Sequence, residues 1–307
     1  MKAAYFEQHG GPDVMRYGDL QDPVARPNEV VVDIHAASVN GADWKVRSGR
    51  DSQVSSFPYI LGRDFSGVIS QVGDGVVDLH AGDAVFGVCD VGQEGAYAEK
   101  IAMKASLVAR KPDTISHVDA AALGLIGLTA LVSVEDTLKL QPGEKTLIQG
   151  GAGGVAGFAI QLAKHIGAHV VTTTSAANLD YVKGLGPDEV IDYEAEDFAA
   201  VVSGCDSVFD TVGGDVARRS FDVLKPGGRA AFIASGGKAP EPTRGDVRSL
   251  RPQVGRDRPH LERIVELVEA GAVRTPETTE FPLSEAAKAQ AISESRHFRG
   301  KLVFRVR

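Results

Sequence analysis

Residues 146–164 read TLIQGGAGGVAGFAIQLAK, an apolar segment that leads through a glycine cluster directly into a helical pattern. Gly151, Gly153 and Ala156 fit the spacing G-x-G-x-x-G/A, which permits a tight turn and brings backbone N–H groups against a pyrophosphate. The helix that follows presents its positive N-terminus to that phosphate. This context favours a dinucleotide-binding turn over a glycine-rich loop without a ligand. The residues expected to contact the cofactor are Gly151, Ala152, Gly153, Gly154 and Val155.

Length and composition indicate an ordinary globular protein. The chain has 307 residues, and a prior of about 150 residues per domain suggests two domains. Hydrophobic residues make up 43% of the chain and charged residues 24%, as in typical folded domains. The net charge of −8 argues against nucleic acid as a partner, because nucleic-acid binding depends on clustered Lys and Arg.

Other sequence features bear on location and redox state. The first residues, MKAAYFE, lack an apolar leader, and no apolar run reaches about 18 residues. We therefore expect a cytoplasmic protein without a membrane partner. Cys89 and Cys205 are the two cysteines, too few for a disulfide framework or a four-cysteine zinc site.

The first part of the chain is rich in short β-type runs separated by Gly, Pro and Asp, which predicts a compact β domain. The predicted strands are 30–34, 67–72, 84–88 and 96–101.

From residue 119 the pattern changes to an Ala- and Leu-rich helix over 119–134, followed by alternating strands and helices. The predicted strands are 146–149, 168–173, 189–191, 207–209 and 229–234. Alternation of this kind builds a parallel sheet in an α/β fold. Residues 236–260 are polar and rich in Gly, Pro and Arg, which favours a mobile connection or lid. A helix over 261–269 and a last strand over 301–304 complete the prediction.

Several segments together resemble one family. Residues 38–49, SVNGADWKVRSG, are similar to the stretch VNPxDxxxRxG, with Gly41 in place of the usual proline. Further matches are 61–68, LGRDFSGV; 128–130, LTA; the glycine turn; 185–193, LGPDEVIDY; and 300–303, GKLV. The chain thus resembles the zinc-free quinone oxidoreductase branch of the medium-chain dehydrogenase/reductase superfamily, including zeta-crystallin-like and alkenal reductase-like proteins.

The resemblance implies an architecture. It implies a GroES-like β domain over residues 1–118, which serves the substrate, and a Rossmann doubly wound parallel sheet over 119–260, which binds the cofactor. Residues 261–307 would form a helix and return to the GroES-like domain, with the active site in the cleft between the domains. The family commonly forms homodimers through the edge of the nucleotide-domain sheet, and the apolar run 229–234 is suited to this pairing.

Departures from the zinc-dependent relatives predict chemistry without a metal. Their metal ligands match Asn40, Arg63 and Asp64 here, and arginine does not ligate zinc. Without a metal to acidify an alcohol, the resemblance implies acceptors that are already electrophilic, namely quinones and α,β-unsaturated carbonyl compounds. Charge then develops on the carbonyl oxygen, so hydrogen-bond donors are the main catalytic need.

Three residues are the catalytic candidates. The resemblance places Asn40 beside the nicotinamide, where its amide would donate to the developing oxyanion; alternatively it caps a turn. Asp43 and Arg63 form either a pair that orients the pocket or a structural ion pair. Many relatives carry a tyrosine where this chain has Arg50 and Asp51, which leaves the proton donor open.

The segment after the second predicted strand of the nucleotide domain favours NADPH. NAD-binding units place an acidic residue about 20 residues beyond the glycines, whereas residues 172–178 read TTTSAAN. Small hydroxyl and amide groups instead suit a 2′-phosphate. By resemblance, Ser175, Asn178 and Tyr193 contact this phosphate, although Ser175 and Asn178 also suit helix capping.

Three more residues are cofactor candidates. Thr129 matches a family threonine near the nicotinamide, unless it only bonds its own helix. Ile233 and Ser235 follow a predicted strand at the carboxyl edge of the sheet, where ligands bind, and would hold the carboxamide. Two alternatives to reduction of quinones and enones remain: an enoyl-thioester reductase, and a non-catalytic zeta-crystallin-like protein that binds NADPH or RNA.

Overall fold

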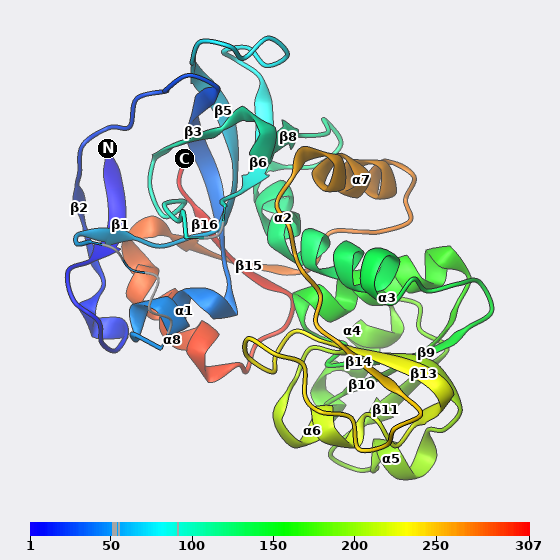
Figure 1. The fold of residues 1–307 in the computed structure, drawn as a ribbon. Helices are drawn as coiled ribbons and strands as arrows, with labels where there is room; N and C mark the ends of the chain where they lie inside the picture. The colour runs from blue at the N-terminus through cyan, green and yellow to red at the C-terminus, as the bar shows by residue number, and fades with distance from the viewer. Residues whose placement is uncertain (51–53, 55, 91) are drawn as a thin grey trace. The chain divides into compact units, whose positions relative to one another are not determined.

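The computed structural model describes residues 1–50, 54, 56–90 and 92–307. Asp51, which stands where many relatives carry a tyrosine, lies outside these residues. The chain forms two compact units, here named the β unit and the parallel-sheet unit (Figure 1). The β unit comprises Met1–Leu125, Arg256–Glu269 and Thr275–Arg307, and the parallel-sheet unit comprises Ile126–Gly255 and Ala270–Arg274.

The boundaries differ from the expected breaks after residues 118 and 260. Helix α2 (His117–Leu131) runs through the first boundary, so its composition changes several residues before the structural division. Helix α7 (Arg258–Glu269) begins before the expected start at residue 261 and packs on strand β8 (Val108–Arg110) of the β unit.

The β unit contains two sheets. One sheet has the order β15-β16-β3-β5-β6-β8, with β7 also paired to β3, and a three-stranded sheet has the order β2-β1-β4. The remaining strands of these sheets are β1 (Lys2–Phe6), β2 (Arg16–Asp19), β3 (Glu29–Val39), β4 (Tyr59–Ile60), β5 (Asp64–Val72), β6 (Ala84–Val88), β7 (Lys100–Lys104), β15 (Thr278–Pro282) and β16 (Lys301–Arg305). The further helical segments of this unit are η1 (Pro12–Val14), α1 (Gly41–Arg47), η2 (Ala105–Leu107), η5 (Leu283–Glu285) and α8 (Ala286–Ser295).

Strand β3 organises the β unit because it pairs with β5, β7 and β16. The prediction of a strand at 30–34 stops too early, since the Ala- and Ser-rich end of β3 has low strand propensity and depends on pairing with β16. The predicted strand 96–101 is displaced to β7. Tyr97 instead bonds to loops and to β1: its N–H donates to the Leu61 carbonyl at 2.9 Å, and its carbonyl accepts from Ala4 at 2.8 Å.

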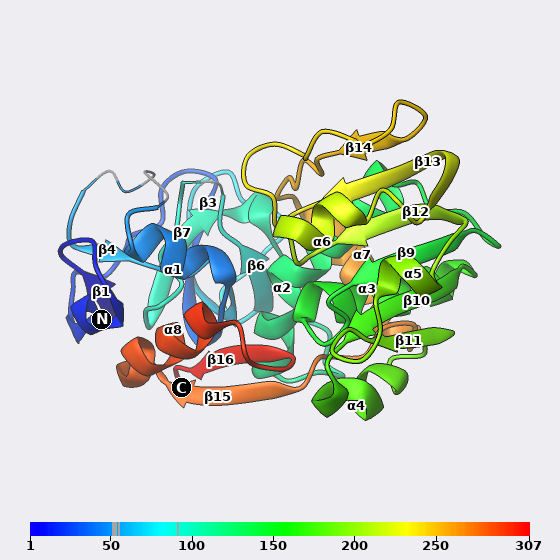
Figure 2. The ribbon, with the colours of Figure 1, turned by 90° about the horizontal axis from the view of Figure 1, so that it is seen from below.

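The parallel-sheet unit holds six parallel strands in the order β11-β10-β9-β12-β13-β14, which lie side by side in Figure 1 and Figure 2. Numbered within the unit, this order is 3-2-1-4-5-6, that of the doubly wound Rossmann fold. The predicted fold class is therefore confirmed. The strands are β9 (Lys145–Gln149), β10 (His169–Thr174), β11 (Glu189–Asp192), β12 (Cys205–Asp210), β13 (Leu224–Phe232) and β14 (Arg248–Leu250). Its helices, after η3 (Val132–Thr137) continues α2, are α3 (Gly154–Ile166), η4 (Ala176–Asn178), α4 (Leu179–Lys183), α5 (Phe198–Val201) and α6 (Gly214–Arg219).

The segment 236–260 is not the structureless connection that its composition suggests. It contains β14, which pairs with β13 from Arg229↔Arg248 to Ala231↔Leu250, and Val247, which is buried in the core. The expectation that 229–234 forms the free edge of the sheet is also wrong, because β13 has β12 on one side and β14 on the other. The short, mostly polar β14 forms that edge.

One helical stretch bears on the expectation about membrane spans. His117–Thr137 is 21 residues long with a hydropathy of 1.7, so by length and composition it passes for a membrane-spanning helix. Asp119 and Glu135 interrupt its apolar run, so the expectation that no unbroken apolar run reaches about 18 residues stands beside this finding. However, 78% of its apolar window is buried inside the protein, as in a core helix of a globular fold.

The glycine turn after β9 requires glycine at a position outside the motif. Gly150 has a φ of +82°, a left-handed conformation that disfavours other residues. A Cβ at Gly150 would lie 2.9 Å from Thr211 Oγ1, which donates to the Gln149 carbonyl at 2.8 Å. A Cβ at Gly151 would lie 2.6 Å from Thr172 Oγ1. The chain therefore passes close to β10 and to the end of β12, with no room for side chains.

This geometry predicts unequal costs for two alanine substitutions. Gly143 has a similar φ of +80°, but a Cβ there would meet nothing within 4 Å. We expect Gly143→Ala to lower the free energy of unfolding by about 1 kcal/mol through backbone strain. Gly150→Ala should lower it by about 2–4 kcal/mol because the clash adds to the strain. Urea denaturation measures both, and equal losses would contradict the steric account.

Candidate active site

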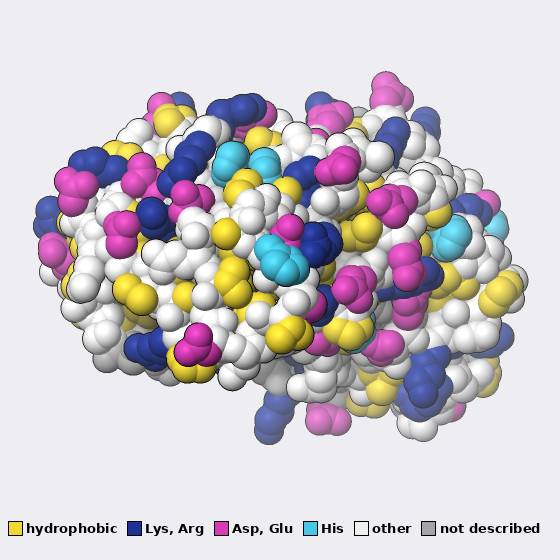
Figure 3. Space-filling view, turned by 90° about the horizontal axis from the view of Figure 1, so that it is seen from above, with side chains coloured by type: hydrophobic (Ala, Val, Ile, Leu, Met, Phe, Trp, Pro, Cys, Tyr) yellow, Lys and Arg dark blue, Asp and Glu magenta, His cyan; other side chains and the backbone are white. Residues whose placement is uncertain are grey.

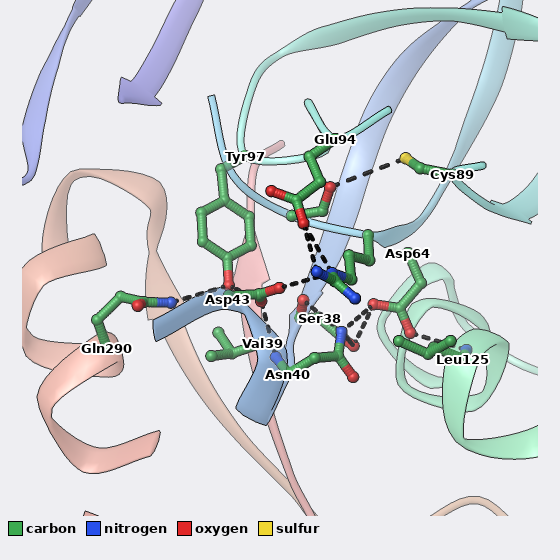
Figure 4. Close-up of polar contacts among 12 residues, drawn as sticks. Ser38, Val39, Asn40, Asp43, Asp64, Cys89, Glu94, Tyr97, Leu125 and Gln290 are labelled. Atoms are coloured by element: carbon green, nitrogen blue, oxygen red, sulfur yellow. Dashed lines mark hydrogen bonds and ion pairs between the residues drawn. The ribbon is translucent and has the colours of Figure 1, made fainter. Parts of the chain in front are cut away.

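A cluster of buried polar side chains lies in the β unit where β3 ends, α1 begins and β5 starts (Figure 4). Its members include Ser38, Asn40, Asp43, Asp64 and Lys301, each at most 8% exposed. Burying charged groups costs free energy unless they are paired and hydrogen-bonded. The partners of each group therefore define what the cluster can do.

Asn40 lies at the start of α1 and is held at both ends of its amide. Its backbone N–H donates to Asp43 Oδ2 at 2.9 Å, which helps to cap the helix. Its Nδ2 donates to Asp64 Oδ1 at 2.7 Å, and its Oδ1 accepts from Lys301 Nζ at 2.8 Å. The carboxylate and the ammonium thus fix which way the amide points. Among the described residues, the remaining acceptors of Nδ2 are the carbonyl and hydroxyl oxygens of Ser38, each at 3.4 Å.

Asp64, the first residue of β5, joins separate elements. Its Oδ1 also accepts from Ser38 Oγ at 2.6 Å. Its Oδ2 accepts from the backbone N–H of Leu125 in α2 at 2.9 Å. The carboxylate therefore connects β3, β5 and the part of α2 that belongs to the β unit.

Arg63 lies between two carboxylates. Its Nε is 2.7 Å from Glu94 Oε1 and 3.6 Å from Asp43 Oδ1, and its Nη2 is 2.7 Å from the same Glu94 oxygen. Asp43 Oδ2 accepts from the Tyr97 hydroxyl at 2.6 Å, which in turn accepts from Gln290 Nε2 at 3.3 Å. The structure thus brings Asp43 and Arg63 together as anticipated, but the nearer partner of Arg63 is Glu94.

Burial sets the protonation of these acids. It raises the pKa of Asp43, while the Arg63 charge opposes the rise. Burial and the Asp43 charge raise the pKa of Glu94 to about 7, against the lowering effect of Arg63. Burial and the neighbouring Glu94 carboxylate also raise the pKa of Tyr59. Tyr59 therefore lies beside Glu94 as well as against the ring of Phe6.

Two members of the cluster were missed at the sequence level. Glu94 lies in a glycine-containing loop whose composition indicates only a surface turn. Lys301 donates to the Val39 carbonyl at 2.9 Å as well as to Asn40. Burial lowers the Lys301 pKa, and Asp64 and Asp43 oppose that effect. The match of residues 300–303 to the family was the one available signal for Lys301.

The donor set does not suit a metal ion. Within residues 1–50, 54, 56–90 and 92–307, no group of three or more His, Cys, Asp or Glu side chains is arranged to hold one. Asp64 is occupied by protein donors, and the cations Arg63 and Lys301 lie where further ligands would be needed.

The cofactor candidates lie in the parallel-sheet unit, mostly at the carboxyl edge of the sheet. Asn178 Nδ2 donates to Ser175 Oγ at 3.1 Å after β10. Tyr193 follows β11, is 56% exposed, and its N–H donates to the Thr174 carbonyl at 3.0 Å. These three residues therefore gather at neighbouring strand ends. Ser175 and Asn178 occupy the N-cap positions of η4 and α4, but within this described segment neither side chain makes a capping hydrogen bond. Both interpretations of these residues therefore stay predictions.

The remaining candidates are placed separately. Ile233 follows β13, and its N–H donates to the Asp210 carbonyl at 3.2 Å. Ser235 Oγ donates to the Lys238 carbonyl at 2.8 Å. Thr129 is half-buried in α2, and its carbonyl accepts from Ser133 Oγ at 2.6 Å.

The raised pKa of Glu94 predicts a pH dependence of stability. The folded protein holds this proton more tightly than the unfolded chain, whose glutamates titrate near 4.5. The stabilisation is complete below about pH 4.5 and is lost as the pH rises through about 7. Relative to Glu94→Gln, the wild type should lose on the order of 2 kcal/mol over this range.

Urea denaturation at several pH values measures this difference. Glu262 in α7 is exposed, so Glu262→Gln is the control and should run parallel to the wild type. If the difference in free energy of unfolding between the wild type and Glu94→Gln does not change with pH, the raised pKa of Glu94 is contradicted.

Two domain families match the chain. The alcohol dehydrogenase GroES-like domain matches residues 26–113, and the zinc-binding dehydrogenase family matches residues 185–304. The chain is 32% identical to the chloroplast envelope quinone oxidoreductase homolog of Arabidopsis thaliana, over 99% of this chain and 98% of that protein. It is also 32% identical to the chloroplastic NADPH-dependent alkenal/one oxidoreductase of Arabidopsis thaliana, over 99% of this chain and 79% of that protein.

Solved structures agree with these relatives. The quinone oxidoreductase from Coxiella burnetii has a TM-score of 0.92 and 35% identity, covering 100% of this chain and 99% of the other. The Escherichia coli quinone oxidoreductase complexed with NADPH has a TM-score of 0.90 and 28% identity, covering 100% of both chains. The chain is therefore an oxidoreductase and belongs to the quinone oxidoreductase branch of the medium-chain dehydrogenase/reductase superfamily.

Proposed function

We propose that this oxidoreductase uses NADPH to reduce quinones or α,β-unsaturated carbonyl compounds without a metal ion. The observation that carries the proposal is the buried cluster around Asn40. Arg63 stands at a position that matches a metal ligand of the zinc-dependent relatives, and the Lys301 ammonium binds the Asn40 amide oxygen. Metal-free reduction suits acceptors that are electrophilic on their own. The names of the relatives, which include quinone and alkenal/one oxidoreductases, support this substrate class.

The residues of the glycine turn fit a dinucleotide. Gly150 and Gly151 leave no room for side chains against the protein, and the first N–H groups of α3 have no acceptor within the helix. A pyrophosphate next to α3 would receive those donors. When bound, the reduced nicotinamide supplies the hydride, and this unit holds and orients it.

The choice of NADPH rests on the ends of β10 and β11. Ser175 and Asn178 offer hydroxyl and amide groups and no carboxylate, and the exposed Tyr193 phenol lies at the next strand end. These neutral donors suit a 2′-phosphate, which a carboxylate would repel. The complex of the Escherichia coli relative with NADPH supports the same choice.

The β unit would stabilise the charge that develops on the acceptor oxygen. Asn40 has one N–H firmly bound to Asp64 and a second whose Ser38 contacts are long, at 3.4 Å. That second N–H is the donor we assign to the acceptor oxygen. Lys301, 2.8 Å from the amide oxygen, adds positive charge that strengthens the donor without moving during the reaction.

We also propose a cytoplasmic homodimer without nucleic-acid or membrane partners. The net charge of −8 supports the first exclusion, and acidic and basic side chains are interspersed on the face in Figure 3. The short edge strand β14 is available for pairing between copies. Light scattering and cell fractionation test the assembly and the location.

Steady-state assays test the main proposal. Chelator-treated protein should oxidise NADPH with a benzoquinone or a 2-alkenal, and kcat/KM should be at least tenfold lower with NADH. Ser175→Ala and Tyr193→Phe should each reduce the preference for NADPH roughly tenfold or more, since a lost hydrogen bond to a charged group costs about 1.5–3 kcal/mol. Loss of activity on metal removal, or a preference for NADH, would refute the proposal. Turnover of an enoyl thioester alone would favour the enoyl reductase alternative.

A further inference from the structure

Within residues 1–50, 54, 56–90 and 92–307, no acidic side chain pairs with Arg251, which lies at the carboxyl edge of the parallel sheet. Arg251 directly follows β14, and its Nη1 donates to the carbonyl of Phe232, the last residue of β13, at 2.6 Å. The side chain is partly buried. Burial lowers the pKa of Arg251. In the part of the chain that the structure describes, no carboxylate offsets this cost.

Arg229 in the same unit shows what a structural arginine looks like here. It donates to the backbone carbonyls of Leu138, Lys139 and Asp206, and Glu144 neutralises it through two contacts of 3.0 and 2.6 Å. Its guanidinium is thus fully used within the protein. Arg251 donates to one carbonyl and leaves the other face of its planar fork for a further acceptor.

The order of the strands indicates which kind of molecule could accept a hydrogen bond from Arg251. The glycine turn at β9 suits the pyrophosphate, and the residues suited to a 2′-phosphate lie on the side of β10 and β11. The nicotinamide end of a dinucleotide then extends over β12 and β13. Neighbouring strands are about 4.8 Å apart, so the end of β14 lies roughly 14 Å from the turn. The anionic groups of a dinucleotide held this way would lie at the turn and toward β10, and the molecule that reacts with its nicotinamide would lie toward β14.

The nearby acid does not compete for Arg251. Asp210, at the end of β12, uses its carboxylate oxygens to accept the N–H groups of Val212 and Gly213. Ser235 is bonded to the Lys238 carbonyl, and the Lys238 side chain is itself cationic. Among the residues that the structure describes, no carboxylate forms an ion pair with Arg251 at this corner of the sheet, and the nearby Asp210 is bound to backbone N–H groups.

We propose that Arg251 binds a carboxylate of the substrate, so that the preferred acceptors are α,β-unsaturated carbonyl compounds that also carry a carboxylate. This inference rests on the proposed function and narrows its substrate class. For 4-oxo-2-pentenoate, the hydride adds to C2 and a proton from solvent adds to C3. The products are 4-oxopentanoate and NADP⁺.

A charged acceptor and its neutral ester test the inference. The wild type should reduce 4-oxo-2-pentenoate with a kcat/KM at least tenfold above that for its methyl ester. Arg251→Gln should lower kcat/KM for the acid roughly 10- to 100-fold, the range for a charge-assisted hydrogen bond. The kcat/KM for the methyl ester and the KM for NADPH should be unaffected. Arg251→Lys keeps the positive charge but loses the planar guanidinium, so its kcat/KM for the acid should lie between those of the wild type and Arg251→Gln.

Arg248→Gln is the matched control, since Arg248 is exposed at the other end of the same strand and its loss removes the same charge. It should leave both acceptors unchanged. Circular dichroism melts show whether Arg251→Gln folds. Binding of 4-oxopentanoate in the presence of NADP⁺, measured by calorimetry, should weaken in both Arg251 variants and not in Arg248→Gln.

Several results would overturn the inference. They are equal rates for acid and ester in the wild type, a parallel loss for both acceptors in Arg251→Gln, or a raised KM for NADPH in that variant, which would assign Arg251 to the cofactor. These are distinct from failure of the proposed function, in which the wild type reduces neither the ester nor a benzoquinone. In that case, unchanged binding of 4-oxopentanoate to Arg251→Gln would reject the carboxylate site independently.

Discussion

The β unit depends on the need to neutralise the buried carboxylate of Asp64. An ionised acid without exposure requires several donors, and Asp64 takes them from Ser38, Asn40 and Leu125. Each donor comes from a different position along the chain, so one charge fixes the end of β3, the start of α1 and the start of α2 relative to β5. Asn40 transmits the constraint to Lys301 in β16. Removal of one member would leave another buried and unpaired, which is the costly outcome for such networks.

The same constraint explains why the cluster suits catalysis without a metal. Arg63 and Lys301 are the cations nearest to Asn40 in this network, and they are held by Glu94, Asp43 and Asn40. Fixed charges of this kind stabilise a developing oxyanion without reorganisation during the reaction. Glu94 adds a group that titrates near neutral pH, so the balance of charge around Arg63 changes within the physiological range. The cluster is thereby both a structural core and an electrostatic device.

Much of the parallel-sheet unit could be predicted from the sequence, because most of its strands are apolar runs with clear turns between them. β14 could not, since Arg-Ser-Leu has no strand signal and its conformation depends on pairing with β13. In the β unit, the resemblance to the family identified Asn40, Asp43 and Arg63 as candidate residues of one site. Lys301 lies 261 residues from Asn40 along the chain, and only the pairing of β16 with β3 makes them neighbours. Glu94 lacked any motif, because its role comes from burial rather than from its sequence context.

The two units differ in how their hydrogen-bond donors are paired with negatively charged groups. In the β unit, both oxygens of Asp64 accept hydrogen bonds from protein donors. Among the described residues, Asp43 Oδ1 and Glu94 Oε2 have no hydrogen-bond donor, and the charge of Arg63 lies beside both acids. In the parallel-sheet unit, the glycine turn offers backbone N–H groups and Arg251 an incompletely used guanidinium, and neither has an acidic side chain of the protein as its partner. Hydrogen-bond donors left without acceptors at a ligand-binding edge cost free energy unless a ligand supplies the acceptors. Such donors therefore indicate the charge of the ligand more directly than the lining of a pocket does.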